Sequence, residues 1–209
     1  QEYFMTTGIR NTLLAIAGFI ALILGLFVNN FMTPKTLSVI EYQELGYFGF
    51  PQAREIKPFS LTDQNGETVG IAALKGHWSL LFFGFTYCPD ICPTTLGVLN
   101  RAVKKMQTPP QIVLVSVDPE RDTPAQLASY LAGFNPDFQG FTGSFDSIVG
   151  LATNVNVAFG KVPGAEPGTY TVDHSASIVV VDPFGQYAGF IKAPHQAEKI
   201  QKIIDSLQR

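Results

Sequence analysis

The N-terminal part of the chain holds a long apolar run. Residues 12–28 (TLLAIAGFIALILGLFV) carry no charged side chain, and residues 29–32 extend the uncharged stretch. About 20 apolar residues allow a helix to cross the hydrocarbon core of a membrane. The residues that follow lack the small-residue pattern at which a signal peptide is cleaved. We therefore expect an uncleaved transmembrane anchor over residues 12–32, preceded by a short segment over residues 1–11.

The next part of the chain shows little periodicity. Residues 33–57 contain prolines at positions 34 and 51, and no regular spacing of apolar residues. Such a stretch is typical of a linker. We expect a tether over residues 33–57 that connects the anchor to a folded domain over residues 58–209.

Within that domain, apolar runs alternate with helical patterns. Strand-like runs occur at residues 59–61, 78–85, 111–117, 138–141, 176–181 and 186–191. Helical patterns, with apolar residues three or four positions apart, begin near Pro93, Thr123, Ser144 and Pro194. The Gly/Pro-rich segment 158–170 predicts an insertion or a long hairpin.

The order of these elements indicates the fold class. Strands that alternate with helices form βαβ units with parallel strands, and the last two strands are joined by the turn sequence of residues 182–185, which makes them antiparallel. We predict an α/β protein, a thioredoxin-like sandwich with a central mixed sheet.

Composition and charge exclude one class of partner. Charged residues make up 15% of the chain, the net charge is −3, and no Lys/Arg stripe is present. This balance gives no basis for nucleic-acid binding. Because the whole predicted domain follows the apolar run, we expect a single-pass protein of the inner (cytoplasmic) membrane with that domain on the exported, periplasmic or equivalent side.

The chain has two cysteines, Cys88 and Cys92, and both follow the apolar run 78–85 at the start of a helical pattern. The end of a central strand is where open α/β sheets place their working sites, and a helix N-terminus favours a thiolate over a thiol. A disulfide that closes so short a loop would add little stability, so a purely structural staple is the weaker interpretation. Disulfide exchange and metal binding remain.

Spacing and a histidine favour the metal. Redox pairs usually have two residues between the cysteines, whereas three separate Cys88 from Cys92. Two sulfurs need a third ligand, and His174 precedes the predicted strand 176–181, where a thioredoxin-like fold faces the cysteines. His77 and His195 are interpreted as turn and helix-start residues. The alternative for His174 is likewise a histidine that stabilises a turn.

Three motifs carry a family resemblance. Cys88-Pro89-Asp90-Ile91-Cys92-Pro93, then the segment 115–124 (VSVDPERDTP), then Val172-Asp173-His174-Ser175 resemble the Sco/SenC family of membrane-tethered copper chaperones for cytochrome c oxidase assembly. The resemblance implies that Cys88, Cys92 and His174 are the copper ligands, for Cu(I) and also for Cu(II). For Asp118 and Asp122 in the second motif, turn formation and capping of the next helix are the simplest roles.

The same resemblance implies a function. The protein would be a metallochaperone rather than an enzyme, and it would deliver copper to the dinuclear copper centre of cytochrome c oxidase subunit II. Other copper chaperones or thioredoxin-like reductants would be further partners. Two alternatives use the same cysteines: a thiol–disulfide oxidoreductase that reduces the partner's cysteines, and a copper or redox sensor.

Overall fold

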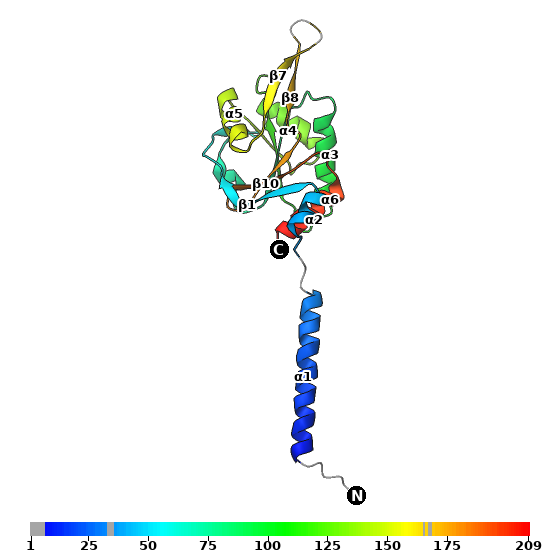
Figure 1. The fold of residues 1–209 in the computed structure, drawn as a ribbon. Helices are drawn as coiled ribbons and strands as arrows, with labels where there is room; N and C mark the ends of the chain where they lie inside the picture. Colours follow the sequence, from blue (N-terminus) through cyan, green and yellow to red (C-terminus); the bar gives the residue numbers. More distant parts are fainter. Residues whose placement is uncertain (1–6, 33–35, 165, 167–168) are drawn as a thin grey trace. The chain divides into compact units, whose positions relative to one another are not determined.

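The computed structural model describes residues 7–32, 36–164, 166 and 169–209. Helix α1 (Thr7–Met32) belongs to one unit, and residues Leu37–Gln208 form a second, compact unit (Figure 1). Within the described residues, α1 is the one helix long and apolar enough to cross a membrane; its candidate span is Thr7–Val28, 22 residues, and an 18-residue window of this span has a mean hydropathy of 2.4. The predicted anchor, residues 12–32, is therefore helical throughout. Residues 1–6 of the predicted N-terminal segment (1–11) and residues 33–35 of the predicted tether (33–57) lie outside the described residues.

The compact unit is built on an eight-stranded mixed sheet with the strand order β1-β10-β9-β4-β5-β6-β2-β3. Its strands are β1 (Tyr47–Glu55), β2 (Leu61–Asp63), β3 (Thr68–Val69), β4 (Ser79–Gly84), β5 (Gln111–Ser116), β6 (Gln139–Thr142), β9 (Ile178–Val181) and β10 (Gln186–Ile191). The neighbours β4, β5 and β6 are parallel, and the other pairs are antiparallel. All six residues of β4 are buried, as expected for a central strand that is covered on both faces.

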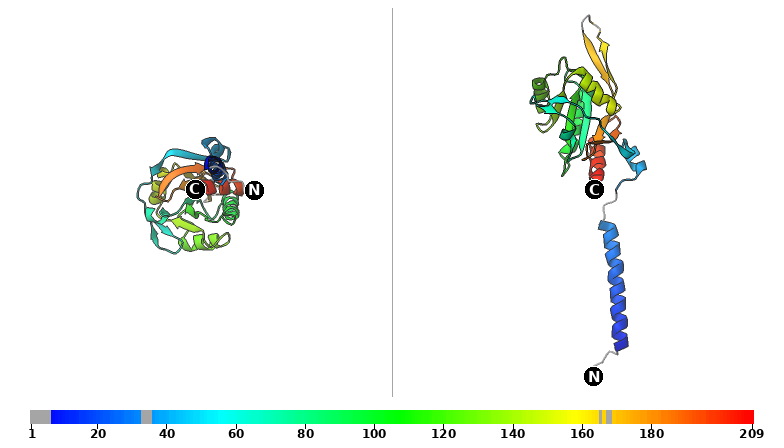
Figure 2. Two further views of the ribbon diagram at one scale, coloured as in Figure 1. Left: turned by 90° about the horizontal axis from the view of Figure 1, so that it is seen from below. Right: turned by 90° about the vertical axis from the view of Figure 1, so that its left-hand side faces the viewer.

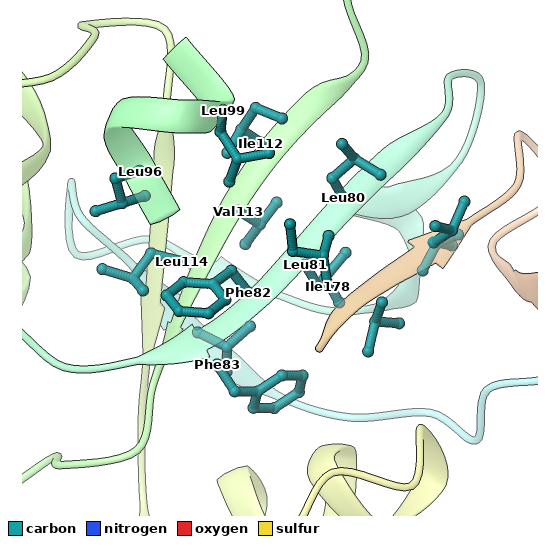
Figure 3. Close-up of a cluster of buried hydrophobic side chains, with 14 of the residues drawn as sticks. Leu80, Leu81, Phe82, Phe83, Leu96, Leu99, Ile112, Val113, Leu114 and Ile178 are labelled. Atoms are coloured by element: carbon teal, nitrogen blue, oxygen red, sulfur yellow. The ribbon is translucent and has the colours of Figure 1, made fainter. Parts of the chain in front are cut away.

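Helices cover both faces of this sheet. They are α2 (Val39–Glu44), the short 3₁₀ helix η1 (Ile71–Leu74), α3 (Ile91–Val103), α4 (Pro124–Ala132), α5 (Phe145–Asn154) and α6 (Ala197–Leu207). Helices α3 and α6 contact each other on one face, and α5 lies on the other (Figure 1). In Figure 3, Leu96 and Leu99 of α3 lie beside the buried side chains of β4 and β5. The packing of α3 against β4 and β5 fixes the positions of these two central strands.

A second, two-stranded sheet projects from the unit. It is a hairpin of β7 (Phe159–Pro163) and β8 (Tyr170–His174), which extends beyond the main sheet in Figure 1 and in the right-hand view of Figure 2. The long hairpin predicted for residues 158–170 is therefore present, although its second strand runs on to His174. The histidine lies at the end of a strand, paired with Phe159, rather than in a loop.

The predicted tether over residues 33–57 is wrong from residue 37 onward. Helix α2 begins with a capping box between Ser38 and Glu41, and β1 adds an edge strand to β10. The sequence did not predict this strand because Pro51 lies within it and proline is depleted in strands. An edge strand tolerates proline, and the pairing register shifts between Gly49 and Arg54, around the proline.

Two helix starts also differ from the prediction. Helix α3 begins at Ile91, before Pro93, and α6 begins at Ala197, after Pro194. Proline is favoured in the first turn of a helix but does not fix the first residue. The earlier start of α3 places Cys92 within its first turn, which matters for the site.

Candidate metal centre

A short turn carries the first cysteine from β4 into α3. The Cys88 backbone N–H donates to the Phe85 carbonyl at 3.3 Å, and the Cys92 backbone N–H points at the Cys88 sulfur at 3.5 Å. Cys88 is half-buried, whereas Cys92 is completely buried beneath the start of α3. Both thiols are free. The turn therefore presents one accessible and one inaccessible sulfur.

Burial of Cys92 makes deprotonation of its thiol less favourable. It raises the pKa of the Cys92 thiol, and the neighbouring Cys88 thiol raises it further. The sequence-based expectation that the helix N-terminus favours a thiolate does not hold for Cys92, because loss of hydration is the larger effect. This sulfur becomes a thiolate when a cation replaces its proton.

His174, the last residue of β8, places its ring beside the cysteines. Its ring meets Phe82 and Phe85 edge-on, with centroids 5.8 and 6.0 Å apart. The ring Nδ1 donates to the Ser175 carbonyl at 3.2 Å, and Nε2 lies 3.5 Å from the Cys92 sulfur. Burial lowers the pKa of His174. Since a carbonyl only accepts, the neutral ring keeps its Nε2 lone pair directed at the cysteines.

The structure thus brings together all three residues that the sequence singled out. The sulfurs of Cys88 and Cys92 and a ring nitrogen of His174 lie within 4.8 Å of one another. Two soft sulfurs and one imidazole form a donor set that suits Cu(I), and the imidazole also suits Cu(II). The cluster fits a copper site.

The other two histidines lie elsewhere. The ring Nε2 of His77 is 2.6 Å from the Gln111 side-chain oxygen, and the His77 side chain is exposed. The ring Nε2 of His195 donates to the Ala176 carbonyl at 2.7 Å, and burial lowers the pKa of His195. Neither belongs to the cluster.

Asp122 stabilises the cysteine turn through hydrogen bonds to Thr86. Its buried carboxylate accepts hydrogen bonds from the Thr86 backbone N–H (3.0 Å), the Thr86 hydroxyl (2.6 Å) and the Ser116 hydroxyl (2.7 Å). Burial raises the pKa of Asp122, while these donors act in the opposite direction. The residue therefore fixes the turn two positions before Cys88.

Asp118 supports the hairpin in a similar way. Its carboxylate accepts a hydrogen bond from the Tyr170 hydroxyl at 2.8 Å and pairs with Arg121. The predicted turn after β5 is present in the backbone, but the helix cap is Thr123, which accepts the Gln126 N–H at 3.2 Å. The capping role predicted for the two aspartates is therefore wrong. Both follow the parallel neighbour of β4, a position that places them at the same sheet edge as the cysteines.

A cleft of about 420 Å³ opens beside the hairpin. It is lined by residues 158–162 of β7 and its approach and by Asp173, His174 and Ser175. One edge of the histidine thus faces open space. His174 is therefore the member of the cluster that lines this cleft, and neither cysteine lines it.

Comparison with known sequences places these residues in a family. The SCO1/SenC family model matches residues 50–209. A protein of Stutzerimonas stutzeri that is named for copper binding is 38% identical over 162 residues, which are 75% of this chain and 78% of that protein. The mitochondrial SCO2 homolog of Mus musculus is 36% identical over 156 residues, 72% of this chain and 60% of its own length. The chain therefore spans less than two thirds of the mouse relative.

Solved structures agree. Arabidopsis thaliana ScoI with copper bound matches with a TM-score of 0.69 and 34% identity over 74% of this chain and 99% of its own. Yeast Sco1 with copper bound matches with a TM-score of 0.67 and 33% identity over 74% of this chain and 89% of its own. BsSco is described as having a disulfide switch and as a member of the Sco family of cytochrome c oxidase assembly proteins. It matches with a TM-score of 0.59 and 28% identity over 75% of this chain and 94% of its own.

These matches confirm the predicted thioredoxin-like sandwich with its mixed sheet. The family model runs from residue 50 to residue 209 and so covers the cysteine turn, the segment 115–124 and the hairpin. The chain belongs to the SCO1/SenC family.

Proposed function

We propose that this protein is a membrane-anchored copper chaperone, which binds copper through Cys88, Cys92 and His174 and delivers it to the dinuclear copper centre of cytochrome c oxidase subunit II. The observation that carries the proposal is the convergence of the two sulfurs and the imidazole within 4.8 Å. The copper bound in the related Arabidopsis and yeast structures supports the choice of metal.

The donor set explains why the cargo would be copper. Thiolates select Cu(I), and two of them with one imidazole leave the metal with few ligands. A closed structural zinc site takes four ligands, and within the described residues the cluster offers three. Loading releases the proton of Cys92, whose pKa is raised by burial, so the affinity rises with pH.

Unequal burial suggests an order for release. Cys88 and His174 are half-buried, and the 420 Å³ cleft lies against the histidine, whereas Cys92 is fully buried. A cysteine or histidine of the partner would therefore replace His174 or Cys88 first. Cys92 would be the last ligand to let go, which keeps copper on the protein until the partner has begun to bind it.

The anchor would confine this exchange to a membrane surface. The apolar helix over Thr7–Val28 supports a single-pass protein of the inner membrane. We place the compact unit on the exported side, where the copper centre of subunit II would be accessible. Other copper chaperones would load the site, and thioredoxin-like reductants would keep its cysteines reduced.

Copper bound per chain tests the proposal. The full chain in detergent, reduced and supplied with Cu(I), should bind one equivalent, and Cys88→Ser, Cys92→Ser and His174→Ala should each weaken binding. His77→Ala is the matched control, because its ring is exposed and lies outside the cluster. A reduced parent that binds no copper, or a His174→Ala variant that binds as the parent does, would overturn the assigned site.

A thiol–disulfide oxidoreductase is the second candidate, favoured by the free and adjacent sulfurs of Cys88 and Cys92. The accessible Cys88 thiolate would attack a partner disulfide, and Cys92 would then displace the partner's second sulfur. The pair would lose two electrons and two protons, and the partner would gain two thiols. This function predicts that His174→Ala retains thiol exchange with a disulfide-bonded subunit II peptide.

A further inference from the structure

Arg121 lies between the two segments that bring the proposed ligands together. Its guanidinium carbon is 5.0 Å from the ring centroid of Tyr87, the residue before Cys88, and 4.0 Å from that of Tyr170, at the start of β8. A third ring, Phe85, lies at 5.7 Å. All three distances are within the range of cation–π attraction.

Polar contacts hold the guanidinium in place. Arg121 Nε pairs with the buried carboxylate of Asp118, and Nη1 donates to the Tyr170 carbonyl at 3.5 Å. The Tyr170 hydroxyl donates to the same Asp118 carboxylate at 2.8 Å. Arg121 and Tyr170 therefore share one buried acceptor, which fixes the strand start relative to the loop after β5.

An outer ion pair reinforces the arrangement. Lys161 of β7 pairs with Glu120 at 2.6 Å and places its ammonium 4.4 Å from the Tyr170 ring centroid. Both side chains are substantially exposed, so this pair is worth little by itself. It nevertheless ties the other strand of the hairpin to the same loop.

We propose that Arg121 is a positioning residue, which clamps the β7–β8 hairpin onto the cysteine turn and so sets how long His174 stays on bound copper. The inference rests on the proposed copper site, but the clamp itself is a property of the metal-free chain. Among the described residues, β7 and β8 form strand pairs with each other and with no strand of the main sheet, so side-chain contacts such as those of Arg121 help to fix where the end of the hairpin lies.

The geometry specifies which property of Arg121 matters. A planar guanidinium can lie on two rings and donate to Asp118 at the same time, whereas an ammonium keeps the charge but loses the flat surface. Arg121→Gln should therefore release the hairpin, and Arg121→Lys should have an intermediate effect. Tyr170→Leu, which removes the stacked ring, should reproduce the effect of Arg121→Gln.

Two readouts test the proposal in the full chain. In the metal-free protein, the backbone amides of residues 171–174 should exchange about tenfold faster in Arg121→Gln, as expected from the loss of three cation–π contacts and an ion pair. With Cu(I) loaded, removal by a chelator should accelerate by a similar factor. The Cu(II) form should show weaker nitrogen coupling in its electron paramagnetic resonance spectrum.

Arg54→Gln is the matched control, because Arg54 also stacks on a ring, that of Phe50 at 3.8 Å, but lies on edge strand β1. It should leave exchange in residues 171–174 and copper loss unchanged. Parental exchange and chelator rates in Arg121→Gln would overturn the clamp while leaving the copper site intact. If the parent binds no copper, the proposed function fails, and amide exchange still decides whether Arg121 holds the hairpin.

Discussion

Gly84 lies directly against the sulfur of Cys92. A Cβ atom added at Gly84 would come within 2.8 Å of that sulfur, and within 3.1 and 3.2 Å of side-chain atoms of Phe82 and Leu114. Real Cβ contacts are essentially never as close as the first of these distances. The last residue of β4 is therefore a glycine because the buried cysteine occupies the space where a side chain would stand.

Replacement of this glycine tests the relationship. Gly84→Ala should move the Cys92 sulfur away from His174, weaken Cu(I) binding at least tenfold, and cost about 1–3 kcal/mol of unfolding free energy through overpacking. Chelator competition and denaturant unfolding measure the two effects. Gly150→Ala is the matched control, because a Cβ atom added there, in helix α5, would meet nothing within 4 Å beyond its own helical turns, and it should stabilise the chain by up to about 1 kcal/mol. Unchanged copper affinity in Gly84→Ala would contradict the packing argument.

Asp122 should be essential for the order of the cysteine turn. Asp122→Ala leaves the Thr86 N–H and the hydroxyls of Thr86 and Ser116 without their acceptor. Since each unsatisfied buried donor costs about 1–3 kcal/mol, we expect a loss of about 3 kcal/mol or more in denaturant unfolding. Modification of Cys88 by a thiol reagent should also become faster. Asp146→Ala, at an exposed position in the first turn of α5, should cost less than about 1 kcal/mol. Equal losses in the two variants would refute the special role of Asp122.

Periodicity predicted the central layers of the fold because these layers depend on local patterns. The apolar runs that became β4 and β5 and the helix starts near Thr123 and Ser144 were all predicted from the sequence. Strand β1 was not, because its burial is only partial and Pro51 interrupts its pattern. An edge strand is defined by the neighbour it pairs with, here β10, and that information is not local.

In the candidate site, too, the sequence predicted the residues with a characteristic chemistry but not those whose role depends on distant segments. Cys88, Cys92 and His174 were found because few residue types can bind a soft metal. The neighbouring residues Gly84 and Arg121 carry no metal-binding group, so their residue types alone do not mark them as part of a site. Their roles depend on a close approach to a sulfur and on rings contributed by distant segments, and only the folded structure shows these contacts.

The segment after residue 36 should behave as part of the domain rather than as a tether. The Ser206 hydroxyl of α6 accepts hydrogen bonds from the Leu37 N–H at 3.0 Å and the Tyr42 hydroxyl at 2.9 Å. Ser206→Ala should speed amide exchange at Leu37 about tenfold, since each lost bond is worth about 1 kcal/mol. Tyr42→Phe, which keeps the ring contact with Tyr47, should have a smaller effect. No protection at Leu37 in the parent would restore the tether interpretation.

His195 should make the protein less stable in mild acid. Burial lowers the pKa of this histidine below its ordinary value of 6.5, and its Nδ1 is buried without a partner in the described structure. Well above pH 6.5 the ring is neutral in both the folded and the unfolded chain, so the full stability is present. As the pH falls below that value, the unfolded chain gains a proton that the folded chain resists. The unfolding free energy then drops, by at most about 1.4 kcal/mol per pH unit for this group.

His195→Gln should remove this contribution and flatten the fall in unfolding free energy between pH about 6.5 and about 5. The pKa of His174 is lowered by burial in the same way, so some slope should remain in the metal-free variant. Denaturant unfolding of the metal-free protein across this range measures both. His77→Gln is the matched control for the loss of an imidazole, because the His77 ring is exposed. A parental slope in His195→Gln would mean that this ring takes up its proton equally well in the folded state, and that the acid sensitivity has another source.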